Sequence, residues 1–333
     1  MASSTSTEPS PPEELRNWLE LPRDVTASIL SRLGSIKIMT TAQMVCKSWL
    51  DICKDPSTWR TIDIHSHEID FEWDSEKMCR DIVDRSCGQL VDFNIEKFGN
   101  DELLRYITAS SSQIKRLRFA SCSDLSDEGL IEAIEKLPLL EELDLTHCEI
   151  SETVIEALGR CCPHFKTLKL YTEAYQRSNY LFPDQEVDFN EDVIAISKNL
   201  PELRHLQLIG SWMNNLGLQA ILDGCCKLES LDLRRCLNIN LKGDLGRRCV
   251  EQIKLVKLPF DSLEGCVCIS DPGEMFSGED DDFPFADQDP FLSNLLEFED
   301  EFDDDFDIGY SDGDGFFDYD DFTAINYDEE DFF

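Results

Sequence analysis

Two cysteines and two tryptophans fall within the stretch MVCKSWLDICKDPSTW, residues 44–59. The thiols of Cys46 and Cys53 could act as nucleophiles or as metal ligands. A nucleophilic cysteine needs a neighbouring base or cation, and a zinc site needs clustered pairs of ligands with further ligands nearby. The local sequence supplies neither arrangement, so we predict neither a reactive thiol nor a metal site here.

The apolar residues of this stretch recur at the spacing of one face of an α-helix. These residues are Val45, Cys46, Trp49, Ile52 and Cys53. Asp55-Pro56 ends the predicted helix, because proline disfavours helical backbone in the residue before it. We therefore expect Cys46 and Cys53 to be small buried thiols that pack in a core.

A second group with possible chemistry is His65 and His67, which lie near Asp63 and Glu68. Two histidines without a third placed ligand make a weak metal motif, and a junction between modules that ends in a helix is the favoured interpretation. No nucleotide-binding loop, nucleophile elbow or pair of catalytic carboxylates appears in a supporting context. The sequence therefore predicts no catalytic residue, no metal and no cofactor.

Charge is distributed unevenly along the 333 residues. Residues 271–333 hold 25 Asp or Glu and no Lys or Arg, which leaves −14 of the formal net charge of −39 for the rest of the chain. Without a basic stripe, the chain is not expected to bind nucleic acid. It has no apolar run of about 18 residues and no signal-peptide pattern at its start. We expect an intracellular protein of nucleus or cytoplasm, with reduced cysteines and no membrane partner.

Upstream of the opening stretch, the segment LELPRDVTASILSRLGSIKIMTTAQ predicts another amphipathic helix. Val25, Ile29, Leu30 and Leu33 fall on one side of it, and Gly34 ends it. Together these segments make three small helices in about 45 residues, and a module of that size buries too little surface to be firmly stable alone. The module is expected to need a partner.

The order and spacing of these residues resemble the F-box over about residues 17–61. The matching elements are Leu21-Pro22, Ile29-Leu30, Leu33, Val45-Cys46-Lys47-Ser48-Trp49, Asp55-Pro56 and Trp59. The resemblance implies docking onto the Skp-type adaptor of a cullin-RING ubiquitin ligase. The adaptor-binding residues that it implies are Leu21, Pro22, Ile29, Leu30, Leu33, Val45, Cys46 and Trp49.

The middle of the chain repeats the pattern apolar-x-x-apolar-x-apolar. Its seven copies begin at Leu90, Ile114, Leu140, Phe165, Leu203, Leu228 and Val250. Cys122, Cys148 and Cys236 each fall eight residues into a copy, where leucine-rich repeats place Asn or Cys. The Cys-Cys pairs at 161–162 and 225–226 likewise follow the repeat register, so we predict no redox role for them. Each copy predicts a strand, a turn and a helix that stack into a solenoid.

The whole order most resembles the plant F-box/leucine-rich-repeat proteins of the Skp-interacting type, over roughly residues 17–260. The expected fold class is α/β: a small all-helical F-box, then a horseshoe arc with a parallel sheet inside and helices outside, and a disordered acidic tail. The expected parts are a disordered N-terminus at 1–16, the F-box at 17–61, a junction and capping helix at 62–89, about seven repeats at 90–260, and the acidic tail at 261–333.

Residues on either side of the central leucine of each strand should point to the open face of the sheet, because strand side chains alternate. An insertion in the longest interval adds aromatic residues that could serve recognition or cover the sheet edge. The expected substrate-binding residues are Arg116, Arg118, Glu142, Asp144, Lys169, His205, Gln207, Asp232, Tyr175 and Tyr180. Their mixed charge suits a protein partner.

Three functions remain open at this point. The first is a non-catalytic substrate-recognition subunit of an SCF-type ligase, with the adaptor, and through it the cullin and the RING protein, as partners. The second is an interaction scaffold that does not lead to ubiquitination. The third is a transcriptional cofactor that acts through the acidic tail, because alternating acidic and aromatic residues are typical of activation segments.

Overall fold

The computed structural model describes residues 20–68, 74–148, 150–172, 190–263 and 266. The chain divides into two units, 1–270 and 271–333, and every described residue belongs to the first. The insertion that carries Tyr175 and Tyr180 lies outside the described residues, as does the acidic tail from residue 267 onward.

The first elements form a small helical module. They are α1 (Arg23–Leu30), α2 (Ser35–Thr40), η2 (Ala42–Met44), α3 (Lys47–Cys53) and η3 (Pro56–Trp59). Gly34 separates α1 from α2 with a φ of +80°, a backbone conformation that glycine adopts without steric cost. The core of the module is made by Leu30, Ile36, Ile52 and Trp59, each at most 3% exposed.

The helix predicted from Val45 begins later than expected. Cys46 is the N-cap of α3 with an extended backbone, φ −158° and ψ 168°, so the continuous helical face that included Val45 was a wrong prediction. Cys46 is only partly buried, whereas the burial of Cys53 is confirmed. Desolvation raises the pKa of the Cys53 thiol, which makes it a poor nucleophile at neutral pH.

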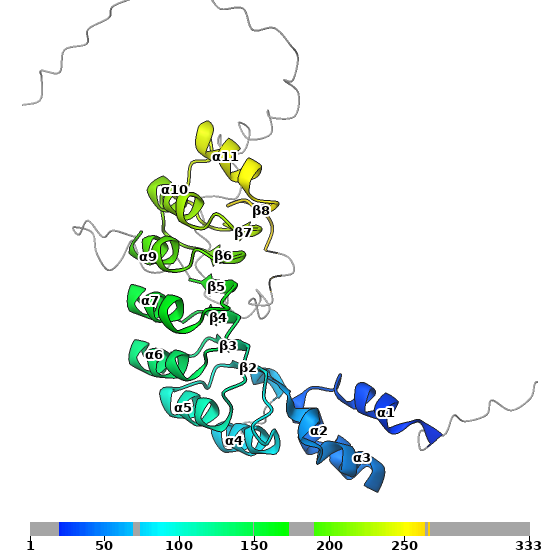
Figure 1. The fold of residues 1–333 in the computed structure, drawn as a ribbon. Coiled ribbons are helices and arrows are strands. Elements are labelled where there is room, and N and C mark those ends of the chain that lie inside the picture. The colour runs from blue at the N-terminus through cyan, green and yellow to red at the C-terminus, as the bar shows by residue number, and fades with distance from the viewer. Residues whose placement is uncertain (1–19, 69–73, 149, 173–189, 264–265, 267–333) are drawn as a thin grey trace, which may run out of the picture. The chain divides into compact units, whose positions relative to one another are not determined.

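Within the described residues, eight strands form one parallel sheet in chain order (Figure 1). They are β1 (Thr61–Ile64), β2 (Asp92–Glu96), β3 (Arg116–Ala120), β4 (Glu142–Thr146), β5 (Thr167–Tyr171), β6 (His205–Ile209), β7 (Ser230–Asp232) and β8 (Leu255–Lys257). Parallel neighbours need crossover connections, and helices supply them. This architecture confirms the predicted α/β repeat fold.

The crossover helices lie side by side along one side of the sheet (Figure 1). They are α4 (Ser75–Arg85), α5 (Asp101–Ser110), α6 (Asp127–Lys136), α7 (Glu152–Cys161), α9 (Glu191–Asn199), α10 (Asn215–Gly224) and α11 (Asp244–Gln252), with the short η4 (Ser66–Glu68) before them. Asn100, Ser126, Ser151 and Asn214 cap four of these helices, each accepting a hydrogen bond from a backbone N–H in the first turn.

Six of the seven predicted strands have the expected register. Asp92, Arg116 and Glu142 are direct neighbours on the open face, and the alternate residues such as Phe93 and Leu117 are at most 1% exposed. The repeat cysteines are buried as predicted: the thiol of Cys122 donates to the carbonyl of Ala120, and those of Cys148 and Cys236 also donate to main-chain carbonyls. Their role is packing and local hydrogen bonding.

The seventh repeat was predicted three residues too early. Val250 lies on α11 and is 67% exposed, whereas Ile253 is buried and occupies the first apolar position before β8. Leu255, not Gln252, is therefore the neighbour of Ser230 on the open face. The apolar pattern fits both registers. The structure decides between them, because Val250 is exposed on the helix and Ile253 is buried.

One strand was missed. Residues 61–64 form β1, which pairs with β2 over its whole length, so the expected junction at 62–89 begins inside the sheet. Trp59, Ile62 and Ile64 are all 0% exposed and have the same apolar spacing as the other repeats. The helix expected later in this segment is present as α4.

The shifted register can be tested by two single substitutions. We expect Ile253→Ala to lower the free energy of unfolding by about 2–4 kcal/mol, because it removes a buried side chain. Val250→Ala, at an exposed helical position, should change it by less than about 0.5 kcal/mol. Urea unfolding of both variants measures the difference, and equal losses would contradict the register.

Candidate functional site

Five large apolar side chains of the helical module are exposed to solvent. They are Leu21, Val25, Leu33, Met44 and Val45, and their exposed fractions run from 36% to 76%, with Met44 the highest. We call these five residues the apolar surface. Single exposed apolar residues are ordinary, whereas protein-binding sites bring several of them together, so five within one small module make it a candidate protein-binding site.

The helix α1 presents apolar side chains in two directions. Leu30 points into the core and is 0% exposed. Thr26 is 5% exposed, and its hydroxyl donates to the carbonyl oxygen of Pro22 at 3.1 Å. Val25 lies on the same helix and Leu33 just after it, and both remain exposed. One side of the helix therefore stabilises the module and the other is available to a partner.

The predicted adaptor-binding residues fall into three groups. Leu21, Pro22, Leu33 and Val45 are exposed, and Ile29, Cys46 and Trp49 are partly buried. Leu30 is 0% exposed, so we assign it to the core and omit it from the contact surface. The prediction also left out Val25 and Met44. Val25 stood on the predicted apolar side of the helix, and Met44 directly precedes Val45 in the opening stretch.

The helical module is tied to the sheet by several contacts around Trp59. The indole N–H of Trp59 donates to the carbonyl oxygen of Cys53 at 2.9 Å, and the guanidinium carbon of Arg85 lies 5.4 Å from its ring centroid. The backbone N–H of Asp63 in β1 donates to the hydroxyl of Ser35 in α2 at 3.1 Å. These contacts join α2 and α3 to the first strand and to α4.

The open face of the sheet carries a row of polar side chains at the third position of each strand. We call this the central row; it consists of Asp63, Asn94, Arg118, Asp144, Lys169, Gln207, Asp232 and Lys257. A parallel row at the first position, the outer row, consists of Thr61, Asp92, Arg116, Glu142, Thr167, His205, Ser230 and Leu255. All eight predicted substrate-binding residues on the strands belong to these two rows.

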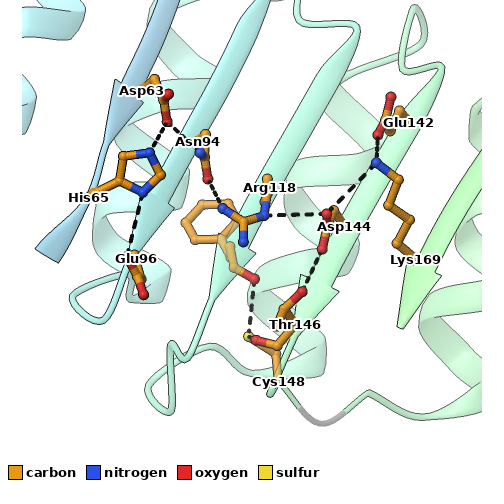
Figure 2. Close-up of polar contacts among 11 residues, drawn as sticks. Asp63, His65, Asn94, Glu96, Arg118, Glu142, Asp144, Thr146, Cys148 and Lys169 are labelled. Carbon is orange, nitrogen blue, oxygen red and sulfur yellow. Dashed lines mark hydrogen bonds and ion pairs between the residues drawn. The ribbon is translucent and has the colours of Figure 1, made fainter. Parts of the chain in front are cut away.

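The first five members of the central row form a continuous chain of contacts across β1–β5 (Figure 2). The Asn94 amide donates to Asp63 and accepts from Arg118 Nη1 at 2.9 Å. Arg118 Nε lies 3.3 Å from an oxygen of Asp144, and Lys169 Nζ lies 4.0 Å from the same carboxylate. The charges in this part of the face are therefore balanced by each other.

Burial gives this chain of contacts its electrostatic character. The Asp144 side chain is 9% exposed, and desolvation raises its pKa, although Thr146, Arg118 and Lys169 all favour its charged form. In the outer row, the carboxylate of Asp92 raises the pKa of the half-exposed Arg116 at a distance of 2.7 Å. We interpret Arg118 and Asp144 mainly as partners of each other within the sheet.

At the start of the chain of contacts, His65 lies between two carboxylates (Figure 2). Its ring nitrogens are 3.4 Å from Asp63 and 3.6 Å from Glu96, and its ring stacks on His67 with centroids 5.5 Å apart. In the part of the chain that the structure describes, no group of three or more His, Cys, Asp or Glu side chains is arranged to hold a metal ion.

The other end of the central row is organised around a buried arginine. Arg234, which is 2% exposed, donates to both oxygens of Asp232 at 2.9 and 2.7 Å and to the carbonyl oxygen of Ser262. Lys257 Nζ lies 3.4 Å from the same Asp232. The outer-row residues here carry no acidic or basic side chain except His205, whose Nδ1 lies 2.9 Å from the Ser230 hydroxyl.

The paired charges of the central row lead to a prediction. We expect Arg118→Ala to lower the free energy of unfolding by about 3 kcal/mol, because it leaves the buried Asp144 carboxylate poorly compensated. Adding Asp144→Asn should recover most of the loss. Arg116→Ala, which removes a half-exposed pair, should cost at most about 1 kcal/mol. Denaturant unfolding measures all of these changes.

The loss of stability in Arg118→Ala should depend on pH. The raised pKa means that the folded chain binds the Asp144 proton at a higher pH than the unfolded chain does. The deficit of Arg118→Ala should therefore shrink as the pH falls from neutral into the acidic range where folded Asp144 becomes protonated. A deficit that grows on acidification, or that persists with Asp144→Asn, would contradict the assignment.

Comparisons with known proteins agree with a helical module followed by repeats. An F-box-like family model matches residues 18–65. The F-box protein SKIP19 of Arabidopsis thaliana is 44% identical over 332 residues, which cover 98% of this chain and 100% of that protein. This chain belongs to the F-box protein family.

Further relatives of this F-box protein include leucine-rich-repeat members of the family. The putative F-box/LRR-repeat protein 22 of Arabidopsis thaliana is 43% identical over 79% of this chain and 84% of that protein. A crystal structure of a TLR13–ssRNA13 complex is 15% identical over 62% of this chain and 30% of that chain, with a TM-score of 0.37. None of the described helices is long and apolar enough to cross a membrane.

Proposed function

We propose that this F-box protein is the substrate-recognition subunit of an SCF-type cullin-RING ubiquitin ligase. Its F-box binds a Skp-type adaptor, and through the adaptor the cullin and the RING protein, while its repeats bind a protein substrate. The observation that carries this proposal is the apolar surface, because five large apolar side chains of one small module are 36% to 76% exposed.

The apolar surface is drawn from two parts of the helical module. Exposed Met44 ends η2 and Val45 follows it, just before α3. Leu21, Val25 and Leu33 lie on or beside α1. Burial of exposed apolar side chains against a partner contributes favourably to the binding free energy, at about 25 cal/mol per Å² removed from water. Val25 and Met44 are added to the predicted contacts, which are kept except for Leu30: Leu21, Pro22, Ile29, Leu33, Val45, Cys46 and Trp49.

The arrangement of the two modules accounts for a non-catalytic role. A ligase subunit of this kind raises the rate by holding a substrate lysine close to the ubiquitin-charged conjugating enzyme, which is a proximity effect. The contacts around Trp59 connect the helical module directly to the first strand of the recognition sheet. The chemistry then belongs to the partner enzymes, and this chain works by positioning, in the nucleus or the cytoplasm.

Adaptor binding can be tested by a double substitution in the apolar surface. We expect Met44→Ser together with Val45→Ser to weaken binding to a purified Skp-type adaptor by at least about tenfold, because two apolar side chains leave the interface. Isothermal titration calorimetry of the full chain measures the dissociation constant.

Leu216→Ser serves as the matched control, because Leu216 is 69% exposed on the repeat helix α10. Its adaptor affinity should equal that of the unaltered chain. Absence of adaptor binding by the unaltered chain would contradict the proposal. Adaptor binding without recruitment of the cullin would instead favour an interaction scaffold.

A further inference from the structure

The central row is interrupted at one residue. Asp63, Asn94, Arg118, Asp144 and Lys169 are linked one to the next, and Asp232 is linked to Lys257. Between these two groups stands Gln207 of β6, which is partly buried. Among the described residues, no side-chain hydrogen bond joins the Gln207 amide to either neighbour, Lys169 or Asp232.

The outer row beside Gln207 lacks the acidic and basic residues that it has at Asp92, Arg116 and Glu142. A shallow depression of about 150 Å³ lies over β5–β8, with Gln207 among its lining residues. Its outer-row neighbours Thr167, His205 and Ser230 offer hydroxyl groups and an imidazole, and Leu255 beside them is 58% exposed. Lys169, Asp232 and Lys257 of the central row also line the depression, so the uncharged groups are those of Gln207 and of the outer row.

The two lysines that line this depression, Lys169 and Lys257, are already paired with carboxylates. Lys169 Nζ lies 2.5 Å from Glu142, and Lys257 Nζ lies 3.4 Å from Asp232. A charged ligand side chain placed here would lose part of its hydration. An acidic side chain would compete with those carboxylates for the lysines, and a basic one would be repelled by the lysines. An uncharged ligand meets neither cost.

The primary amide of Gln207 is well suited to bind a peptide group. It provides two donors and one acceptor, which match the C=O and N–H of a peptide group. We propose that the β5–β8 part of the open face, centred on Gln207, binds an extended segment of the substrate polypeptide whose side chains are uncharged. The Gln207 amide exchanges hydrogen bonds with its main chain, and Leu255 contacts an apolar side chain at one end.

The dimensions set the length of the segment. Four neighbouring strands at a spacing of about 4.8 Å span about 14 Å, and an extended peptide rises about 3.3 Å per residue. About four to five residues therefore cross the depression. The assignment rests on the proposed function, because it takes the repeats as the substrate-binding part, and it adds the chemical class of the segment that they bind.

A random peptide library displayed on phage and selected on the immobilised full chain tests the assignment. Selected sequences are then synthesised with blocked ends and a fluorescent label, and their dissociation constants are measured by anisotropy. We expect the residues shared by the selected peptides to be uncharged. We also expect Gln207→Ala and Gln207→Glu each to weaken binding by about tenfold or more, because a peptide group loses its partner or faces a carboxylate.

Gln219→Ala is the matched control, because Gln219 is an exposed glutamine on α10, in the helical layer. Its peptide affinity should equal that of the unaltered chain. The assignment is overturned if no peptide is selected, if the shared residues are charged, or if binding is insensitive to both Gln207 substitutions. Adaptor titration of the same variants is a separate measurement. Failure of adaptor binding would refute the proposed function, whereas the peptide measurements alone test the binding site at Gln207.

Discussion

The indole of Trp59 is the contact on which the two-module arrangement depends. It is completely buried, and within the helical module it donates a hydrogen bond to the carbonyl oxygen of Cys53. It also occupies the first apolar position of the repeat that contains β1. The same side chain therefore belongs to the core of the F-box and to the core of the repeats. A module too small to be stable alone is completed by the sheet that follows it.

Stacking extends this core along the chain. Each repeat buries the apolar side chains of its strand and helix against the next repeat, and neighbouring strands exchange main-chain hydrogen bonds. Exposed ion pairs also connect successive repeats, as between Lys115, Glu141 and Lys166, and these lower the pKa of Glu141. Such pairs contribute little at the surface, so the apolar core supplies most of the stability. The polar rows are then free to differ from strand to strand.

The sequence predicted most of this fold because apolar spacing directly reports burial. It placed six strands correctly, from Asp92 to Asp232, and located the repeat cysteines in the core. It was wrong where a pattern fitted two structures. Val250 and Ile253 both start an acceptable repeat, and only the packing of α11 separates them. The first strand was missed because Trp59 already had an explanation within the helical module.

The candidate sites were less predictable, since they depend on which side chains meet. Leu30 and Val25 share a helix and an apolar character, yet one is core and the other surface. Among the described residues, Gln207 forms no side-chain hydrogen bond with its strand neighbours because those neighbours contact other groups. The sequence alone does not show these contacts. Arg118 and Asp144 were correctly placed on the open face, but burial and mutual pairing give them a role within the sheet.

Native-state hydrogen exchange in increasing denaturant tests the central claim, that the F-box and the repeats share one core through Trp59. Amides of α3 and those of β1 and β2 should show the same opening free energy and should merge into one cooperative unit. Exchange of the α3 amides through a separate opening of much lower free energy, with β1 and β2 still protected, would contradict the account and make the two modules independent.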